Sequence, residues 1–293
     1  MIKNAFALRL TAAQEVEALN AALARCAFQP LGGLSAESAG FVPYEDGLRL
    51  IHEAAGILAG RVRIDKKIVP ASTVKQKVKE RCAYIENQQG YKPGRKQVKE
   101  IKEQVLESIL PTALASTTFI NFYFYEDILV IATSGSAAAD RVVGLLAKCL
   151  EPFPITTLNT ARSPAAGMTE WLIGDEAPAG FTLGQMAEMK AADESRASVR
   201  WQRETIDTER AQEHFRQGKS VIKLALNFED KVDFTLNDKG VITQIAMLDV
   251  LKESREEAAG DAGDVDADLA LYGTTVHELI TALINALGGV KAD

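Results

Sequence analysis

The chain has 293 residues, 47% of them hydrophobic, so it can bury a sizeable core in two domains or in one elaborated domain. No apolar run approaches the roughly 20 residues that cross a bilayer, and the N-terminal stretch turns polar too early for a signal peptide. The three cysteines, Cys26, Cys82 and Cys149, have no metal-binding spacing and are typical of thiols in a reducing compartment. We therefore expect a cytoplasmic protein without a membrane span.

The first 70 residues (1–70) are predicted to form an α+β part of the fold. Residues 5–10 alternate like a strand, and Thr11 is a candidate cap for the helix that follows. Short strands are then expected at residues 40–44, 48–52 and 57–64. Pro70 prevents the last of them from continuing inside a sheet, because proline has no backbone N–H to donate.

Residues 71–112 are predicted to form a basic helical arm inserted into this part of the fold. Between Arg61 and Gln104 there are 13 Lys and Arg residues against 5 acidic residues, a net charge of +8. The whole chain carries −7, so the other 249 residues carry −15. Such segregated charge indicates an anionic partner. The alternative is a solvated arm held by Lys–Glu pairs, but only five acidic residues are available to form them.

The arm is expected to contain two helices, separated by Gly90, Pro93 and Gly94. Thr73 and Gln76 have the spacing of a capping box at the first helix. Apolar residues recur at helical spacing in both helices: Val74, Val78, Cys82 and Ile85 in the first, and Val98, Ile101, Val105 and Ile109 in the second. We therefore predict that the two stripes pack as a hairpin, with the basic side chains along its edges.

The rest of the chain is predicted to continue the first α+β part (113–160) and then to form a C-terminal α+β half (161–293). In the first segment, a strand hairpin at 119–125 and 128–132 precedes a helix at 137–150. In the C-terminal half, the expected elements are a short helix at 168–173, a strand at 198–203, a helix at 207–217, strands at 220–227, 231–236 and 241–248, and a closing helix at 269–287. Residues 253–268 are acidic and are predicted to be a loop.

No catalytic motif is apparent. The Gly218–Lys219–Ser220 stretch resembles the end of a phosphate-binding loop, but Glu213 stands where that loop needs a glycine. Asp264, Asp266 and Asp268 have calcium-loop spacing without the required turn glycine or final glutamate. The three histidines, His52, His214 and His277, are far apart in sequence and are expected to be surface or packing residues. We therefore predict no enzyme activity, no cofactor and no metal site, with an enzyme built from dispersed residues as the alternative.

Several strings along the chain resemble the bacterial recombination-associated protein RdgC family. They include NAFALRL, IVPASTVKQKV, GRKQVKEIKEQVLESILP, GKSVIKLALNFEDKVDFTL and HELITALINALGG, in this order from one end to the other. The resemblance implies a ring-shaped homodimer of α+β subunits that encloses double-stranded DNA in a basic hole. It also implies DNA binding independent of sequence, nucleoid association, and a role in limiting the access of the recombinase RecA to DNA.

The resemblance also implies which residues face DNA and which form the dimer interface. The DNA-facing residues are Lys75, Lys77, Arg95, Lys96 and Lys99 in the arm, with Arg200 and Arg203 in the C-terminal half. Thr112 and Leu114 fall at the dimer interface, where many members have an arginine and an aromatic residue (LLPRAF). Glu204 replaces an amide of a KKQDL pattern. These departures imply weaker ring closure or weaker DNA binding than is usual for the family.

The leading hypothesis is therefore a sequence-nonspecific clamp on duplex DNA, in which phosphate contacts supply the affinity. The alternative is a protein-interaction module whose basic arm docks an acidic partner. Competition by unrelated duplex DNA would distinguish the two.

Overall fold

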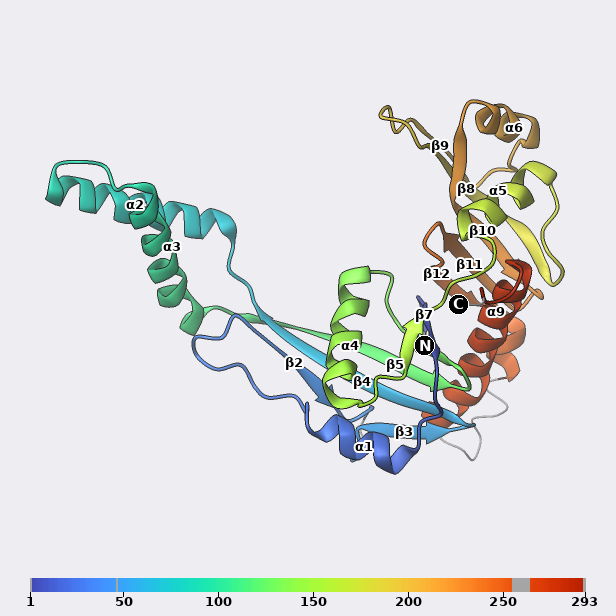
Figure 1. The fold of residues 1–293 in the computed structure, drawn as a ribbon, viewed down its shortest axis with the longest axis horizontal. Helices are drawn as coiled ribbons and strands as arrows, with labels where there is room; N and C mark the ends of the chain where they lie inside the picture. The colour runs from blue at the N-terminus through green and yellow to red at the C-terminus, as the bar shows by residue number, and fades with distance from the viewer. Residues whose placement is uncertain (1, 46, 255–263, 292–293) are drawn as a thin grey trace. The chain divides into compact units, whose positions relative to one another are not determined.

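The computed structural model describes residues 2–45, 47–254 and 264–291, which form an α+β fold with two antiparallel sheets (Figure 1). The chain divides into two compact units. The main unit consists of Met1–Arg25, Pro43–Gly60 and Ile120–Asp293, and the arm unit consists of Cys26–Val42 and Arg61–Phe119. No helix among the described residues has both the length and the hydropathy needed to cross a bilayer.

The first sheet contains two long strands, β4 (Ile57–Lys67) and β5 (Ala115–Tyr125), of 11 residues each. In spatial order its strands are β2 (Glu37–Val42), β4, β5, β6 (Ile128–Ile131), β1 (Phe6–Leu10) and β7 (Ile155–Thr157), with β3 (Ile51–Ala54) paired to β4. The predicted hairpin around Glu126 and Asp127 is confirmed, with Tyr125 opposite Ile128. Packing requires a glycine at position 60, because a Cβ atom there would collide with the ring of Phe122.

The second sheet lies in the main unit. Its strands are, in order, β12 (Ile242–Met247), β11 (Val232–Asn237), β10 (Lys219–Phe228), β8 (Phe181–Ala191) and β9 (Ser198–Gln202). The helices of this unit include α1 (Val16–Ala24), α4 (Ser136–Cys149), α5 (Pro164–Gly174), α6 (Thr208–Arg216), α8 (Asp264–Asp268) and α9 (Thr274–Ala286), the last preceded by a π-helical turn at Leu269–Gly273, and residues 249–254 are helical as well.

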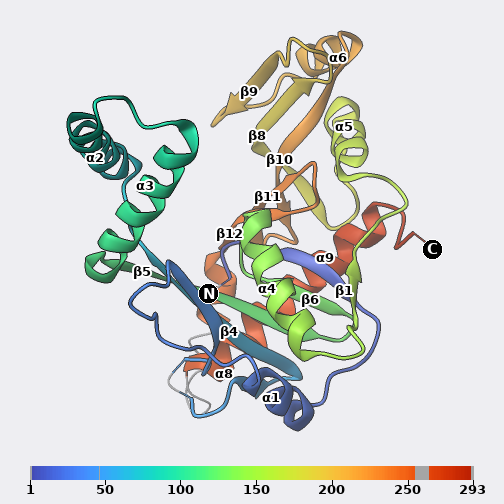
Figure 2. The same ribbon diagram turned by 60° about the vertical axis from the view of Figure 1, so that its left-hand side comes forward.

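The main unit has a core to which both sheets contribute. Tyr123 and Ile128 of the first sheet, Phe234 of the second and Leu279 of α9 belong to one buried cluster. Figure 2 shows α1 and α4 together on one side of the first sheet, and the two helices contact each other. The strands and helices predicted for residues 119–150 are therefore present and packed.

The predicted pair of helices at 71–112 is also present, as α2 (Ala71–Gln89) and α3 (Arg95–Ile109) (Figure 1). The two helices pack on each other around a small core of their own, separate from that of the main unit. It consists of the buried Val74, Ile101 and Val105, with Val69, Val78, Cys82, Ile85, Leu106 and Ile109 partly buried against them. The predicted stripes are thus confirmed, except that Val98 is only half-buried and lies outside this core.

Both predicted helix caps are wrong. The helix after β1 begins at Val16 with Glu15 at the cap, so Thr11 lies outside it. In α2 the cap position is Pro70, and Thr73 lies inside the first turn without a capping hydrogen bond. Gln76 instead donates to Glu80 at 3.0 Å. The backbone at Pro70 is extended, with ψ of 130°, so the helix can start directly after it at Ala71. A cap at Thr73 would have placed the start three residues later, at Val74.

Two further differences concern the C-terminal half. Strand β8, which joins β9 to the rest of the second sheet, was not predicted, because its register shifts against β10 and its polar residues hide the alternation. The predicted acidic loop at 253–268 is wrong at both of its described ends, since Glu253, Ser254 and Asp264–Asp268 are helical. Residues 255–263 of that prediction lie outside the described residues.

A polar network around the buried Asp65 joins β4 and β5. Arg63 donates two hydrogen bonds to the carboxylate of Asp65, at 2.9 and 2.8 Å, and the Thr117 hydroxyl donates a third at 2.8 Å. These bonds, first of all those from Arg63, lower the pKa of the buried Asp65 carboxyl against the opposing effect of burial. The network therefore needs the charged form of Asp65.

We expect Asp65→Asn to lower the free energy of unfolding by about 1.5–3 kcal/mol, the range for hydrogen bonds to charged groups. Because the folded-state pKa is lowered, the stabilisation is fully present above the unfolded carboxyl pKa of about 3.9 and is lost as the pH falls through the folded value. Urea unfolding should therefore show the difference at pH 7 and its disappearance at more acidic pH. Asp249→Asn is the matched control, since that exposed carboxylate also pairs with a cation, Lys252, and should contribute much less. An unchanged urea midpoint for Asp65→Asn at pH 7 would contradict the role of the network.

Candidate nucleic-acid interface

The α2–α3 hairpin carries a set of exposed cations. The predicted residues Lys75, Lys77, Arg95, Lys96 and Lys99 are all exposed, as are Lys79, Arg81 and Lys102. Within the described part of the chain, none of these eight side chains lies in an ion pair with a carboxylate. The alternative of a solvated arm held by Lys–Glu pairs therefore lacks the pairs that it requires.

The helical geometry sorts these cations by face. Arg95, Lys99 and Lys102 follow one another at i, i+4 and i+7, so they share one side of α3 beside the packed stripe. Lys96 lies on the side of α3 opposite to that stripe. A charged row of this kind can follow the phosphates of a nucleic acid backbone without reading base edges.

Three of the four basic residues on strand β4 are engaged within the protein, unlike those on the helices; the fourth, Lys66, is exposed. Arg63 pairs with Asp65 and stacks over the Phe28 ring at 4.5 Å. Arg61 lies over the Phe119 ring at 5.6 Å, and the Lys67 ammonium donates to the Gly33 carbonyl at 2.6 Å. The net charge of +8 counted in the sequence therefore overstates what this segment can offer to a ligand.

Arg200 and Arg203 lie in the main unit, on and just after β9. Both are exposed, and among the described residues neither forms an ion pair. They line a hollow of about 580 Å³ on the second sheet, together with amide side chains at Gln185, Gln202, Asn227 and Gln244. Two acids, Asp230 and Asp233, border the same hollow and reduce its positive charge.

The two residues predicted for the dimer interface, Thr112 and Leu114, lie at the end of the hairpin. Thr112 is exposed and its hydroxyl donates to the Ile109 carbonyl at 3.2 Å. Leu114 is 80% exposed and accepts a backbone hydrogen bond from Ile68, which is itself 56% exposed. Two large apolar side chains on paired backbones are therefore exposed to solvent here.

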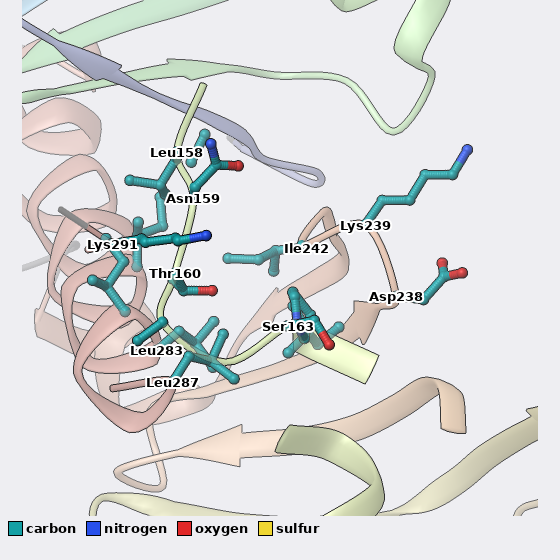
Figure 3. Close-up of a pocket in the computed structure, with 17 residues that line it drawn as sticks. Leu158, Asn159, Thr160, Ser163, Asp238, Lys239, Ile242, Leu283, Leu287 and Lys291 are labelled. Atoms are coloured by element: carbon teal, nitrogen blue, oxygen red, sulfur yellow. The ribbon is translucent and has the colours of Figure 1, made fainter. Parts of the chain in front are cut away.

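A cavity of about 590 Å³ lies in the main unit between the second sheet, α9 and residues 158–164 (Figure 3). Polar and apolar groups contribute similarly to its wall, with Ile242, Leu283 and Leu287 among the apolar lining residues, and the Lys291 side chain extends along it. Asp238 is the one carboxylate among the lining residues, and no histidine or cysteine joins it. The cavity therefore holds no paired acid–base groups.

The histidines have closer acidic neighbours than the sequence suggested. His52 Nε2 lies 2.6 Å from Asp266 Oδ1, and His277 Nε2 lies 3.5 Å from Glu126 Oε2. His214 packs edge-on against Trp201 with ring centroids 5.9 Å apart. His277 packs in the protein interior, and it also joins Glu126 and Asp127 in one cluster. These residues are some 150 positions apart in sequence, so no local motif could reveal the cluster.

Comparison with known proteins gives consistent matches over nearly the whole chain. A family model described as "Putative exonuclease, RdgC" matches residues 1–290. A protein of Bordetella parapertussis named "Recombination-associated protein RdgC" is 41% identical over 99% of this chain and 98% of its own length. A protein of the same name from Cupriavidus necator is 40% identical over 95% of this chain and 93% of its own length. A third, from Dechloromonas aromatica, is 40% identical over 77% of this chain and 76% of its own length.

Proposed function

The chain belongs to the RdgC family, and from this we propose that it acts in recombination as a sequence-nonspecific binder of double-stranded DNA. The observation that carries the proposal is the set of exposed cations on α2 and α3 that lack carboxylate partners among the described residues. Phosphates would supply the missing counter-charge, and their contacts are independent of base sequence. The relatives' shared name, "Recombination-associated protein RdgC", supports the biological setting.

The proposal extends to assembly. Two copies would close a ring around the duplex, with Leu114 and Ile68 contributing apolar surface to the contact between subunits. Their exposure supports this, since large apolar side chains exposed side by side are typical of interaction surfaces. Bound rings would keep RecA from the DNA that they cover. Sedimentation of the protein as a monomer at micromolar concentration would contradict the ring, and RecA filaments forming equally fast on DNA saturated with the protein would contradict the antagonism.

The decisive test changes the charge of the hairpin without changing its packing. Arg95→Ala and Lys99→Ala should each weaken binding to duplexes of unrelated sequence to the same extent. Each should also flatten the dependence of log K on log[salt] by about one unit, through the loss of about one phosphate contact. Stability should change by less than about 0.5 kcal/mol, because both side chains are exposed on a helix. The measurement is fluorescence anisotropy of a labelled random-sequence duplex at several salt concentrations.

Lys148→Ala is the matched control, since it removes one exposed positive charge from α4, outside the proposed interface. If Arg95→Ala and Lys99→Ala bind DNA as the control does, the hairpin is not the DNA surface. Failure of unlabelled duplex to compete would have the same meaning. The docking of an acidic protein partner on the hairpin would then become the better hypothesis.

We also propose that the protein binds DNA without cleaving it. The described residues around the hairpin cations include no cluster of metal-ligating side chains, and Glu213 leaves Gly218–Lys219–Ser220 without a phosphate-binding loop. Purified protein should therefore leave end-labelled duplex and single-stranded DNA intact in about 10 mM Mg²⁺ or Mn²⁺, and EDTA should leave DNA affinity unchanged. Metal-dependent release of nucleotides that co-purifies with the protein would refute this and would support the exonuclease description of the family model.

A further inference from the structure

Three potential metal ligands from two distant segments converge in the main unit. Glu126 and Asp127 form the turn between β5 and β6, and His277 lies in the first part of α9. One ligand atom from each of the three side chains lies within 4.8 Å of the other two. The turn and the helix are thus brought together with one imidazole and two carboxylates between them.

The His277 imidazole is packed in place, but one of its ring nitrogens makes no hydrogen bond to the described residues. His277 is only 9% exposed, and its Nε2 atom makes no hydrogen bond within the described part of the chain. That atom lies 3.5 Å from Glu126 Oε2, and the Tyr125 ring packs edge-on against the imidazole with centroids 4.6 Å apart. A buried ring nitrogen that makes no hydrogen bond is unfavourable, and here it lies close to the carboxylate of Glu126.

We propose that Glu126, Asp127 and His277 form a binding site for a divalent transition-metal ion of the Zn²⁺ class. An imidazole nitrogen with carboxylate oxygens is a donor set that Zn²⁺ accepts, whereas Mg²⁺ and Ca²⁺ prefer oxygen ligands alone. The ion would use the unpartnered Nε2 atom and offset the repulsion between the two adjacent carboxylates. Three protein ligands leave at least one position for water. Bound there, the ion would tie the β5–β6 turn to α9.

A second turn in the same unit shows what the same acidic pair does without a histidine. The turn between β10 and β11 also reads Glu–Asp, at Glu229 and Asp230. There the Glu229 carboxylate pairs with the Lys231 ammonium at 2.7 Å and raises the pKa of that lysine. At the β5–β6 turn the position of Lys231 is taken by Ile128, and His277 approaches instead. The two turns therefore differ in the group that faces their carboxylates.

The test is a metal titration of the full-length protein after EDTA treatment and dialysis. Calorimetry with Zn²⁺, and the visible absorption of Co²⁺ as a spectroscopic substitute, should each show one saturable site per chain. Zn²⁺ should raise the melting temperature, because the ion binds the folded state, while Mg²⁺ should not compete at equal concentration. Glu126→Gln and His277→Gln should each weaken Zn²⁺ binding at least about tenfold and abolish the rise in melting temperature.

Two matched variants make the result specific. Glu229→Gln removes the corresponding carboxylate from the turn that has no histidine, and His52→Gln removes the other histidine that faces a carboxylate, Asp266. Both should bind Zn²⁺ as the unmodified protein does. The side chain of Glu126 is 65% exposed, so Glu126→Gln should fold normally even if His277→Gln does not.

Three results would overturn the inference. They are the absence of saturable Zn²⁺ binding, equal Zn²⁺ affinity in Glu126→Gln and unmodified protein, and an equal loss of affinity in Glu229→Gln. Each would leave His277 and Glu126 as an ion pair only. Duplex affinity is measured separately, so failure of the metal site is distinguishable from failure of the proposed DNA interface.

Discussion

Replacing Ile101 by aspartate should unfold the α2–α3 hairpin and lower duplex DNA affinity at least about tenfold, because the Lys and Arg side chains would no longer be held in place along the two helices. Ile101 is 3% exposed and lies with Val74 and Val105 in the centre of the small hairpin core. An unpaired carboxylate there has no cationic partner and costs several kcal/mol, roughly as much as so small a core can supply. Loss of helical circular dichroism should accompany the loss of anisotropy on labelled duplex.

Two substitutions act as controls for this effect. Ile101→Val keeps the position apolar and should cost only about 0.5–1.5 kcal/mol, with DNA affinity retained. Val98→Asp, the substitution that the sequence pattern alone would favour, should be milder than Ile101→Asp, since Val98 is half-buried and outside the core. If Ile101→Asp lost its helical signal and still bound DNA with unchanged affinity, the hairpin would not be the DNA surface.

Salt should produce the second large effect. If about six to eight Lys and Arg side chains neutralise phosphates, the logarithm of the DNA association constant should fall against log[salt] with a slope of about −5 to −7. This slope corresponds to a loss of about 10³–10⁴ in affinity between 50 and 200 mM salt. The expectation rests on the exposed cations of the hairpin together with Arg200 and Arg203. The same titration by anisotropy gives the slope directly.

A combined Arg95→Ala and Lys99→Ala protein should show a slope flatter by about two units at every duplex sequence tested. A slope shallower than about −2 for the unmodified protein would mean that few phosphates are contacted, and it would contradict the proposed interface.

The elements that the sequence predicted well are those with a strong local period. The apolar residues of α2 and α3 recur at helical spacing, and Gly90 has the positive φ of 80° that ends α2 where the pattern breaks. The β5–β6 hairpin follows from two apolar runs around Glu126 and Asp127. Strand β8 could not be predicted in this way, since its pairing with β10 is interrupted by irregularities and its burial does not alternate cleanly.

The sequence predicted which residue types form the candidate site, but not which of their side chains are free to contact a ligand. Counting charges could not separate Arg63, whose guanidinium is bound by Asp65, from Arg95, which is exposed and without a carboxylate partner among the described residues. That distinction depends on which strands lie beside each other. The cluster at His277 depends on the same kind of information, because α9 meets the β5–β6 turn only in the folded chain.

The separate core of the hairpin has a consequence for motion. Opening α2 from α3 exposes only the small apolar set around Val74, Ile101 and Val105, whereas opening β10 or β11 disrupts the cluster that both sheets share. The hairpin is therefore a cooperative unit with a low opening free energy, and its backbone amides should exchange with deuterium well before those of β10 and β11. A ligand that bridges both helices would slow that exchange, so protection at residues 71–109 would report on occupancy without any change in the rest of the fold.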